Sequence, residues 1–244
     1  FIIPPWYKYT FRLDMLLYPA CFAVFYMISY ILLISALKEG PTSLTNIICS
    51  FQSIVPIIVS LILWKESIGI FQVIGLILFV IVLLLFNQGS YSEGEESKKI
   101  SFKWAVLAGF STLTVGIAVI FTKQYMLTYD GFIKEYLIMY NFIALLIGLP
   151  YLIIFRINRD KKFLLDRKFL FYTASPALIT DITNMIYMFY ITKFKSALFF
   201  PLMSILNIIS VVIFSRIILK ENVSKTAYAG IILSFAAIYL LSMK

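Results

Sequence analysis

The stretch LILWKESIGIFQVIGLILF, residues 61–79, sets two apolar runs around one charged pair, Lys65-Glu66. A helix on the surface of a soluble protein carries polar side chains along a whole face, at every turn. Here the charges are confined to a single step. The pattern therefore predicts two helices that cross a lipid bilayer and meet at a short turn, where the charges reach headgroups and water.

The composition of the whole chain extends this interpretation. The 244 residues are 61% hydrophobic and 14% charged, with a mean hydropathy of +0.95. In an average globular protein about 25% of the residues are charged. A water-soluble fold of this size could not bury so much apolar side chain, so the sequence predicts a membrane protein.

Charge and missing residue types exclude several functions. The net charge is +9, but the basic residues lie between the apolar runs, which is typical of membrane-flanking loops and not of a nucleic-acid groove. Histidine is absent, which excludes imidazole catalysis and His-ligated metals. Cys21 and Cys49 lie singly within apolar runs. We expect no metal site, no cofactor and no nucleic-acid partner.

Eight apolar runs are long enough to cross the hydrocarbon, which takes about 20 residues. Backbone groups cannot stay unpaired in lipid, and the runs are too long for barrel strands, so we expect an all-α, polytopic protein. Lys and Arg occur in loops on both sides, and the orientation stays open. The predicted spans are 14–37, 42–63, 67–87, 103–126, 133–155, 169–191, 196–218 and 224–242.

The charged step returns late in the chain, as Lys220-Glu221 in IILKENVSKTAYAGIIL, residues 217–233. Glu66 and Glu221 are 155 residues apart (221 − 66), and so are Gly75 and Gly230 (230 − 75). This structural repeat motif indicates an internal duplication, which is common among transporters. Its glycines allow neighbouring helices to approach closely.

The two copies have different lengths. Three predicted spans precede the polar stretch 88–102 and five follow it. If the unit has five helices, two more are expected before Phe1. Because five is odd, the second copy would insert upside down relative to the first.

Two stretches carry a resemblance to a known family. ALKEGPTSLTNIICSFQSIVPIIVSLILWKESIGIFQVIGLILF, from residue 36, resembles the closing half of an EamA repeat of the drug/metabolite transporter superfamily. KSALFFPLMSILNIISVVIFSRIILKENVSKTAYAGIILSFAAIYLLS, from residue 195, resembles the same half of the second repeat. It departs from the first copy by placing Val211 where that copy has Pro56.

The resemblance implies ten helices in two inverted five-helix repeats around a central cavity, of which eight are seen in this N-terminally truncated chain. The first repeat would span 1–87, the connecting loop 88–102 and the second repeat 103–244. It further implies a secondary transporter, not an enzyme, which moves a small metabolite or drug-like solute by alternating access. The expected setting is a bacterial plasma (inner) membrane, with a proton as a candidate coupling ion.

Asp181 is the most informative single residue. It lies near the middle of span 169–191, where an ionisable group costs at least a few kcal/mol and is a functional candidate by default. Asn184 and Tyr187 follow it on one stripe of the helix. The carboxylate could bind a cationic solute or cycle a proton, or it could pair with a Lys or Asn of a neighbouring helix for packing.

Several further residues are candidates for lining a cavity. Polar residues at helical spacing either line a cavity or hold helices together by hydrogen bonds, and deep tyrosines can stack on an aromatic or cationic ligand. These candidates are Asn46, Ser53, Asn207, Tyr140 and Tyr26. By contrast, Lys123, Lys134 and Glu135 lie near predicted helix ends, where we expect their charges to reach the membrane surface.

Two other functions remain as alternatives. A membrane-embedded enzyme that modifies lipid would need a clustered catalytic set, and the chain has no histidine, no acidic pair at helical spacing and no GxSxG motif. A non-transporting scaffold or assembly factor would use Asp181 for packing alone. No Walker A loop is present, which argues against ATP-driven transport by this chain.

Overall fold

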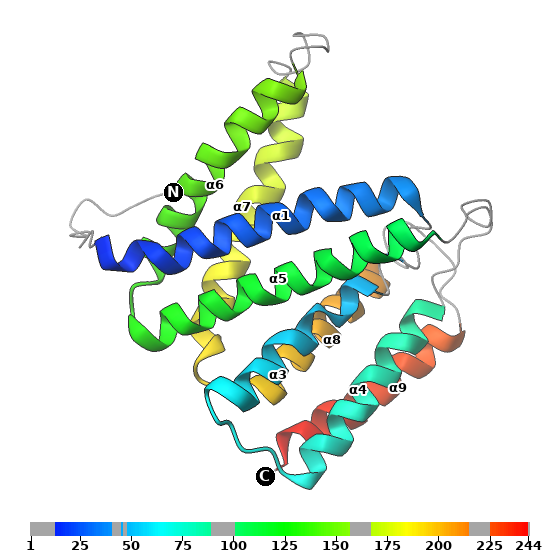
Figure 1. The fold of residues 1–244 in the computed structure, drawn as a ribbon. Coiled ribbons are helices and arrows are strands. Elements are labelled where there is room, and N and C mark those ends of the chain that lie inside the picture. The colour runs from blue at the N-terminus through cyan, green and yellow to red at the C-terminus, as the bar shows by residue number, and fades with distance from the viewer. Residues whose placement is uncertain are drawn as a thin grey trace. The chain divides into compact units, whose positions relative to one another are not determined.

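The computed structural model describes residues 13–40, 45, 48–88, 101–156, 167–214 and 225–243. Within these ranges all regular structure is helical, which confirms the all-α prediction (Figure 1). The elements are η1 (Leu13–Leu16), α1 (Leu17–Glu39), η2 (Phe51–Ser53), α3 (Ile54–Leu63), α4 (Ile70–Gln88), α5 (Phe102–Thr128), α6 (Ile133–Arg156), α7 (Arg167–Ile191), α8 (Ser196–Phe214) and α9 (Lys225–Ser242).

The second predicted span differs most from the structure. Its described part is not one continuous α-helix, because the short 3₁₀ turn η2 precedes α3. Pro56 has no N–H and cannot donate to the carbonyl of Gln52, so the α-helical ladder loses a bond there. The N–H of Ile54 donates to the carbonyl of Phe51 instead, as a 3₁₀ bond.

Length and exposure both fit a bilayer. In the part of the chain that the structure describes, three helical segments are long and apolar enough to cross a membrane, namely Leu13–Glu39, Phe102–Thr128 and Ile133–Pro150, and four shorter apolar helices occur as well. Large apolar side chains point outward from them; on α4, for example, Ile70 is 69% and Ile77 is 58% exposed. Such surfaces suit contact with lipid and not with water.

The chain divides into two compact units. Unit 1 comprises residues 1–27 and 121–193, and unit 2 comprises residues 28–120 and 194–244. Each unit therefore combines sequence from both expected repeats. The division into repeats at 88–102 stays a prediction, and residues 89–100 lie outside the described part of the chain.

In unit 2, α4 and α9 lie side by side (Figure 1). They run antiparallel, because Gln72 at the start of α4 donates from Nε2 to the carbonyl of Leu241 at the end of α9, over 3.3 Å. Gly75 makes the close approach possible: a Cβ at this position would lie 2.8 Å from Leu241 Cγ. Phe79 and Ala237 extend the same contact into a buried core.

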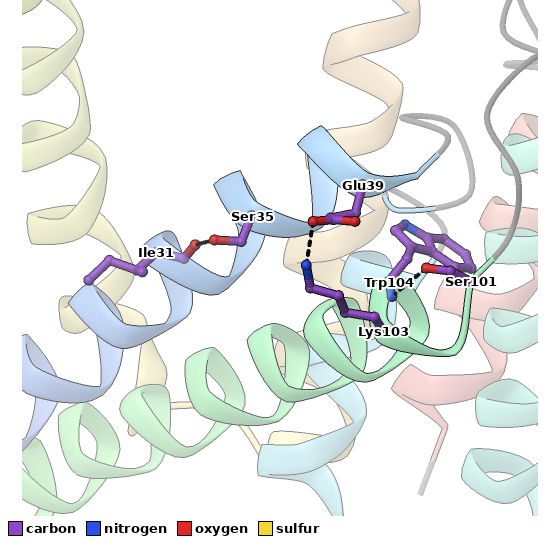
Figure 2. Close-up of polar contacts among 6 residues, drawn as sticks. All are labelled: Ile31, Ser35, Glu39, Ser101, Lys103 and Trp104. Carbon is purple, nitrogen blue, oxygen red and sulfur yellow. Dashed lines mark hydrogen bonds and ion pairs between the residues drawn. The ribbon is translucent and has the colours of Figure 1, made fainter.

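The second half of α1 and the first half of α5 also pack against each other within unit 2. Ser29 Oγ donates to the carbonyl of Ser111 over 2.9 Å, so each hydroxyl finds a partner away from lipid. Figure 2 shows the polar end of this pair, where Lys103 Nζ lies 2.5 Å from Glu39 Oε1. Ser101 caps α5 by accepting the N–H of Trp104 over 3.1 Å (Figure 2).

Glu66 does more than reach the membrane surface. Its Oε2 accepts the backbone N–H of Ser196 over 2.7 Å, and its Oε1 lies 3.2 Å from Ser196 Oγ. Ser196 opens α8, and the carbonyl of Lys195 receives the first helical bonds, so Glu66 occupies the positive end of the α8 dipole. Because Glu66 lies three residues after the end of α3 and Ser196 begins α8, the packed helices α3 and α8 run antiparallel.

Replacement of Gly75 by alanine tests the α4–α9 packing. We expect Gly75→Ala to destabilise the protein by about 1–3 kcal/mol, because the new methyl group would overpack against Leu241 and Ala237. The measurement is chemical unfolding in detergent micelles. The matched control is Gly109→Ala in α5, where a Cβ would meet no atom within 4 Å; equal losses in both variants would contradict the packing argument.

Neutralising Glu66 tests the capping contact. We expect Glu66→Gln to cost about 1–2 kcal/mol, because a neutral amide makes weaker bonds to a helix N-terminus than a carboxylate. Glu39→Gln serves as the control, since the exposed ion pair of Glu39 with Lys103 should contribute less than about 1 kcal/mol. Unfolding curves of the two variants that coincide would rule out this role of Glu66.

Candidate functional site

Asp181 lies in α7 and is bonded to α6 within unit 1. Its Oδ1 accepts a hydrogen bond from Tyr140 OH over 2.9 Å and another from Asn141 Nδ2 over 3.2 Å. Tyr140 is buried, whereas Asp181 and Asn141 are half-buried. The two helices are therefore joined by a carboxylate that remains partly open on one side.

Asn184 completes this polar cluster from the next turn of α7. Its Nδ2 donates to Tyr140 OH over 3.3 Å, so the tyrosine hydroxyl accepts one bond and donates another. Met188, one further turn along the same stripe, is buried. On the opposite side of α7, Ile182 and Ile186 are exposed. The helix thus keeps its polar stripe inside the protein and its apolar face outside.

Aromatic rings adjoin the cluster. Phe22 of α1 stacks on Tyr26 at a centroid distance of 5.2 Å and meets Tyr140 edge-on at 5.2 Å. Tyr136 lies 6.0 Å from Tyr140 and 5.9 Å from Phe22. Rings in this arrangement offer faces that can attract a cation.

Among the described residues, the hydrogen-bond partners of Asp181 are neutral groups only. Both of its donors are neutral groups, and both bond to Oδ1. No lysine or arginine pairs with Asp181 in the described ranges. Neutral donors solvate a carboxylate but leave its charge uncompensated. The arrangement can bind an organic cation.

The structure brings together several predicted residues and leaves others apart. Asp181, Asn184 and Tyr140 form one bonded cluster, and Tyr26 adjoins it through Phe22. Tyr187 is half-buried in the same unit. Their role in solute binding stays a prediction.

The remaining candidates belong to unit 2 or lie outside the described residues. Ser53 is buried, and its Oγ has no hydrogen-bond partner in the described part of the chain. Asn207 of α8 is exposed. Asn46 and the motif residue Glu221 fall outside the described residues. Gly230, the counterpart of Gly75, is buried like it.

One sequence-based expectation is wrong. Lys123 and Glu135 do not reach the surface of the protein: their exposed fractions are 3% and 1%. The helix ends that carry them are covered by neighbouring parts of the chain, and Lys134 between them is only half-buried. Sequence reasoning also missed Phe22, whose apolar character gave no signal of its contact with Tyr140.

No metal-binding group emerges from the described residues. Nowhere among them do three or more Cys, Asp or Glu side chains gather closely enough to hold a metal ion.

Comparisons with known proteins bear on the whole chain. The EamA-like transporter family matches residues 1–88 and 102–243. No curated protein matches. Among solved structures 22 chains match, and one of them, described only as "Crystal structure of protein", aligns with a TM-score of 0.58 at 11% identity. That alignment covers 96% of this chain and 88% of the other, and at this identity it shows similarity of fold alone.

Proposed function

Because this chain belongs to the EamA-like transporter family, we propose that it is a secondary transporter that moves a small metabolite or drug-like solute by alternating access. Membership of the family makes it a multi-pass membrane protein of a class that transports small solutes and is not enzymatic. The finer proposal includes a bacterial plasma (inner) membrane as its location. A scaffold that does not transport is the alternative, in which Asp181 serves packing alone.

Helix directions support two inverted repeats as the basis of this mechanism. An offset of 155 residues pairs α3 with the end of α8, and it pairs α4 with α9. Both pairs run antiparallel, as the contacts Glu66–Ser196 and Gln72–Leu241 require. Equivalent helices of an inverted repeat must have opposite directions, and rocking of such repeats gives alternating access. We propose the ten-helix arrangement on these grounds.

Asp181 is the observation that carries the solute assignment. An acid in the middle of a membrane helix is rarely tolerated without a purpose, and Asp181 has neutral partners only. We propose that a positively charged group of the solute, such as an ammonium, binds to the carboxylate of Asp181. The rings of Tyr140, Phe22 and Tyr26 add cation–π attraction.

Transport by a secondary transporter needs a driving gradient. We propose that a proton is exchanged for the cationic solute, because exchange of like charges keeps the carrier's net charge constant through the cycle. The same exchange would let a proton gradient drive export of the solute.

Flux measurements test the proposal. Uptake of radiolabelled tetraethylammonium and phenethylamine into proteoliposomes should exceed that in protein-free liposomes, and benzoate should show no such excess. Asp181→Asn should lower the cation flux about 10- to 100-fold, because losing a charge-assisted interaction at a half-buried site removes about 1.5–3 kcal/mol.

Asp130→Asn is the matched control, since Asp130 is exposed beside α6 and its replacement is chemically the same. It should transport at the wild-type rate. Full cation flux in Asp181→Asn would refute the assignment of Asp181, and benzoate flux without cation flux would refute the cationic solute class. Absence of any flux in a well-folded protein would favour the scaffold.

A further inference from the structure

Glu135 is a second buried carboxyl group, and the candidate solute site does not use it. It is the third residue of α6, in unit 1, and its side chain is 1% exposed. Neither Oε1 nor Oε2 has a hydrogen-bond partner among the described residues. Buried polar atoms nearly always have a partner, so an unpartnered carboxyl group calls for an explanation.

Helix capping does not supply that explanation. A glutamate at the third position of a helix usually reaches back to the N–H of the capping residue. Here the N–H of Phe132, which precedes α6, donates to the carbonyl of Tyr129 over 3.4 Å. The carboxyl group of Glu135 therefore does not cap α6.

Other ionisable groups lie on the elements of the same unit. Tyr125 OH donates to the carbonyl of Phe132, Tyr136 OH bonds with Thr122, and Tyr129 OH bonds with Asp14, so these hydroxyls are engaged away from Glu135. The further ionisable groups on the elements of this unit include Lys123 of α5, Lys134 beside Glu135 and Tyr187 of α7.

A charge buried without a partner is very costly, so a buried carboxyl group of this kind requires either a counter-charge or a bound proton. No ion pair of Glu135 occurs among the described residues.

We propose that Glu135 is the residue that carries the coupling proton. In one step the carboxylate takes a proton from water on one side of the membrane and becomes a neutral carboxylic acid. In the return step the O–H bond breaks and the proton leaves to water on the other side. The coupling role rests on the proposed transport function, whereas proton binding by Glu135 does not.

Infrared spectroscopy of the purified full-length chain in lipid nanodiscs tests proton binding without any solute. A protonated carboxylic acid has a carbonyl stretching band separate from the carboxylate bands. We expect such a band at neutral pH, its loss in Glu135→Gln, and a shifted band in Glu135→Asp, which keeps the ionisable group. Glu39→Gln, at an exposed position, is the matched control and should leave the band unchanged.

Two results would overturn the proposal: no carboxylic acid band in the wild type between pH 5 and 8, or a band that persists in a folded Glu135→Gln variant. If Glu135→Gln does not fold, the Glu135→Asp spectrum decides, since an unshifted band would assign the proton elsewhere.

A transport measurement then separates coupling from transport itself. In proteoliposomes, an imposed pH gradient should accelerate tetraethylammonium flux at least about 10-fold in the wild type and not in Glu135→Gln, while solute-for-solute exchange persists in both. Gradient-driven flux in Glu135→Gln would refute the coupling role. Loss of exchange in the wild type as well would instead refute the proposed transport function and leave proton binding by Glu135 standing.

Discussion

Hydrocarbon offers no hydrogen-bond partner, and this constraint accounts for most of the side-chain hydrogen bonds of the described helices. Some satisfy themselves within their own helix, as when Ser35 Oγ donates to the carbonyl of Ile31 (Figure 2). Others join two helices, as Ser29 and Ser111 do. Asp181 also has hydrogen-bond partners, but these are neutral donors and supply no positive charge opposite its carboxylate. That difference separates a residue that holds helices together from one suited to recognising a solute.

Both candidate functional carboxyl groups lie in unit 1, Glu135 on α6 and Asp181 on α7. Glu135 directly precedes Tyr136, whose ring contacts Tyr140, and Tyr140 OH bonds to Asp181. Ring contacts and a hydrogen bond thus connect Tyr136, the residue after Glu135, with Asp181. A shift of the α6 backbone at Glu135 would reach Asp181 through Tyr136 and Tyr140, within one compact unit.

Much of this architecture could be predicted from the sequence, because lipid imposes long apolar runs. Span 133–155 corresponds to α6 and span 169–191 to most of α7, and Asp181 stood out as an acid within such a run. Partners distant in sequence could not be predicted: nothing near Glu66 indicates that its carboxylate caps a helix 130 residues later. The burial of Lys123 and Glu135 could not be predicted either, because their positions near helix ends do not tell whether another segment covers them.

The central claim is that the charge of Asp181 is reserved for the solute. It is tested most directly by a cryo-electron microscopy structure of the full-length protein with phenethylamine bound. Our account predicts the ammonium nitrogen within hydrogen-bond distance of an Asp181 carboxylate oxygen, beside the ring of Tyr140. A bound amine that is held elsewhere, with Asp181 still bonded only to Tyr140 and Asn141, would contradict it.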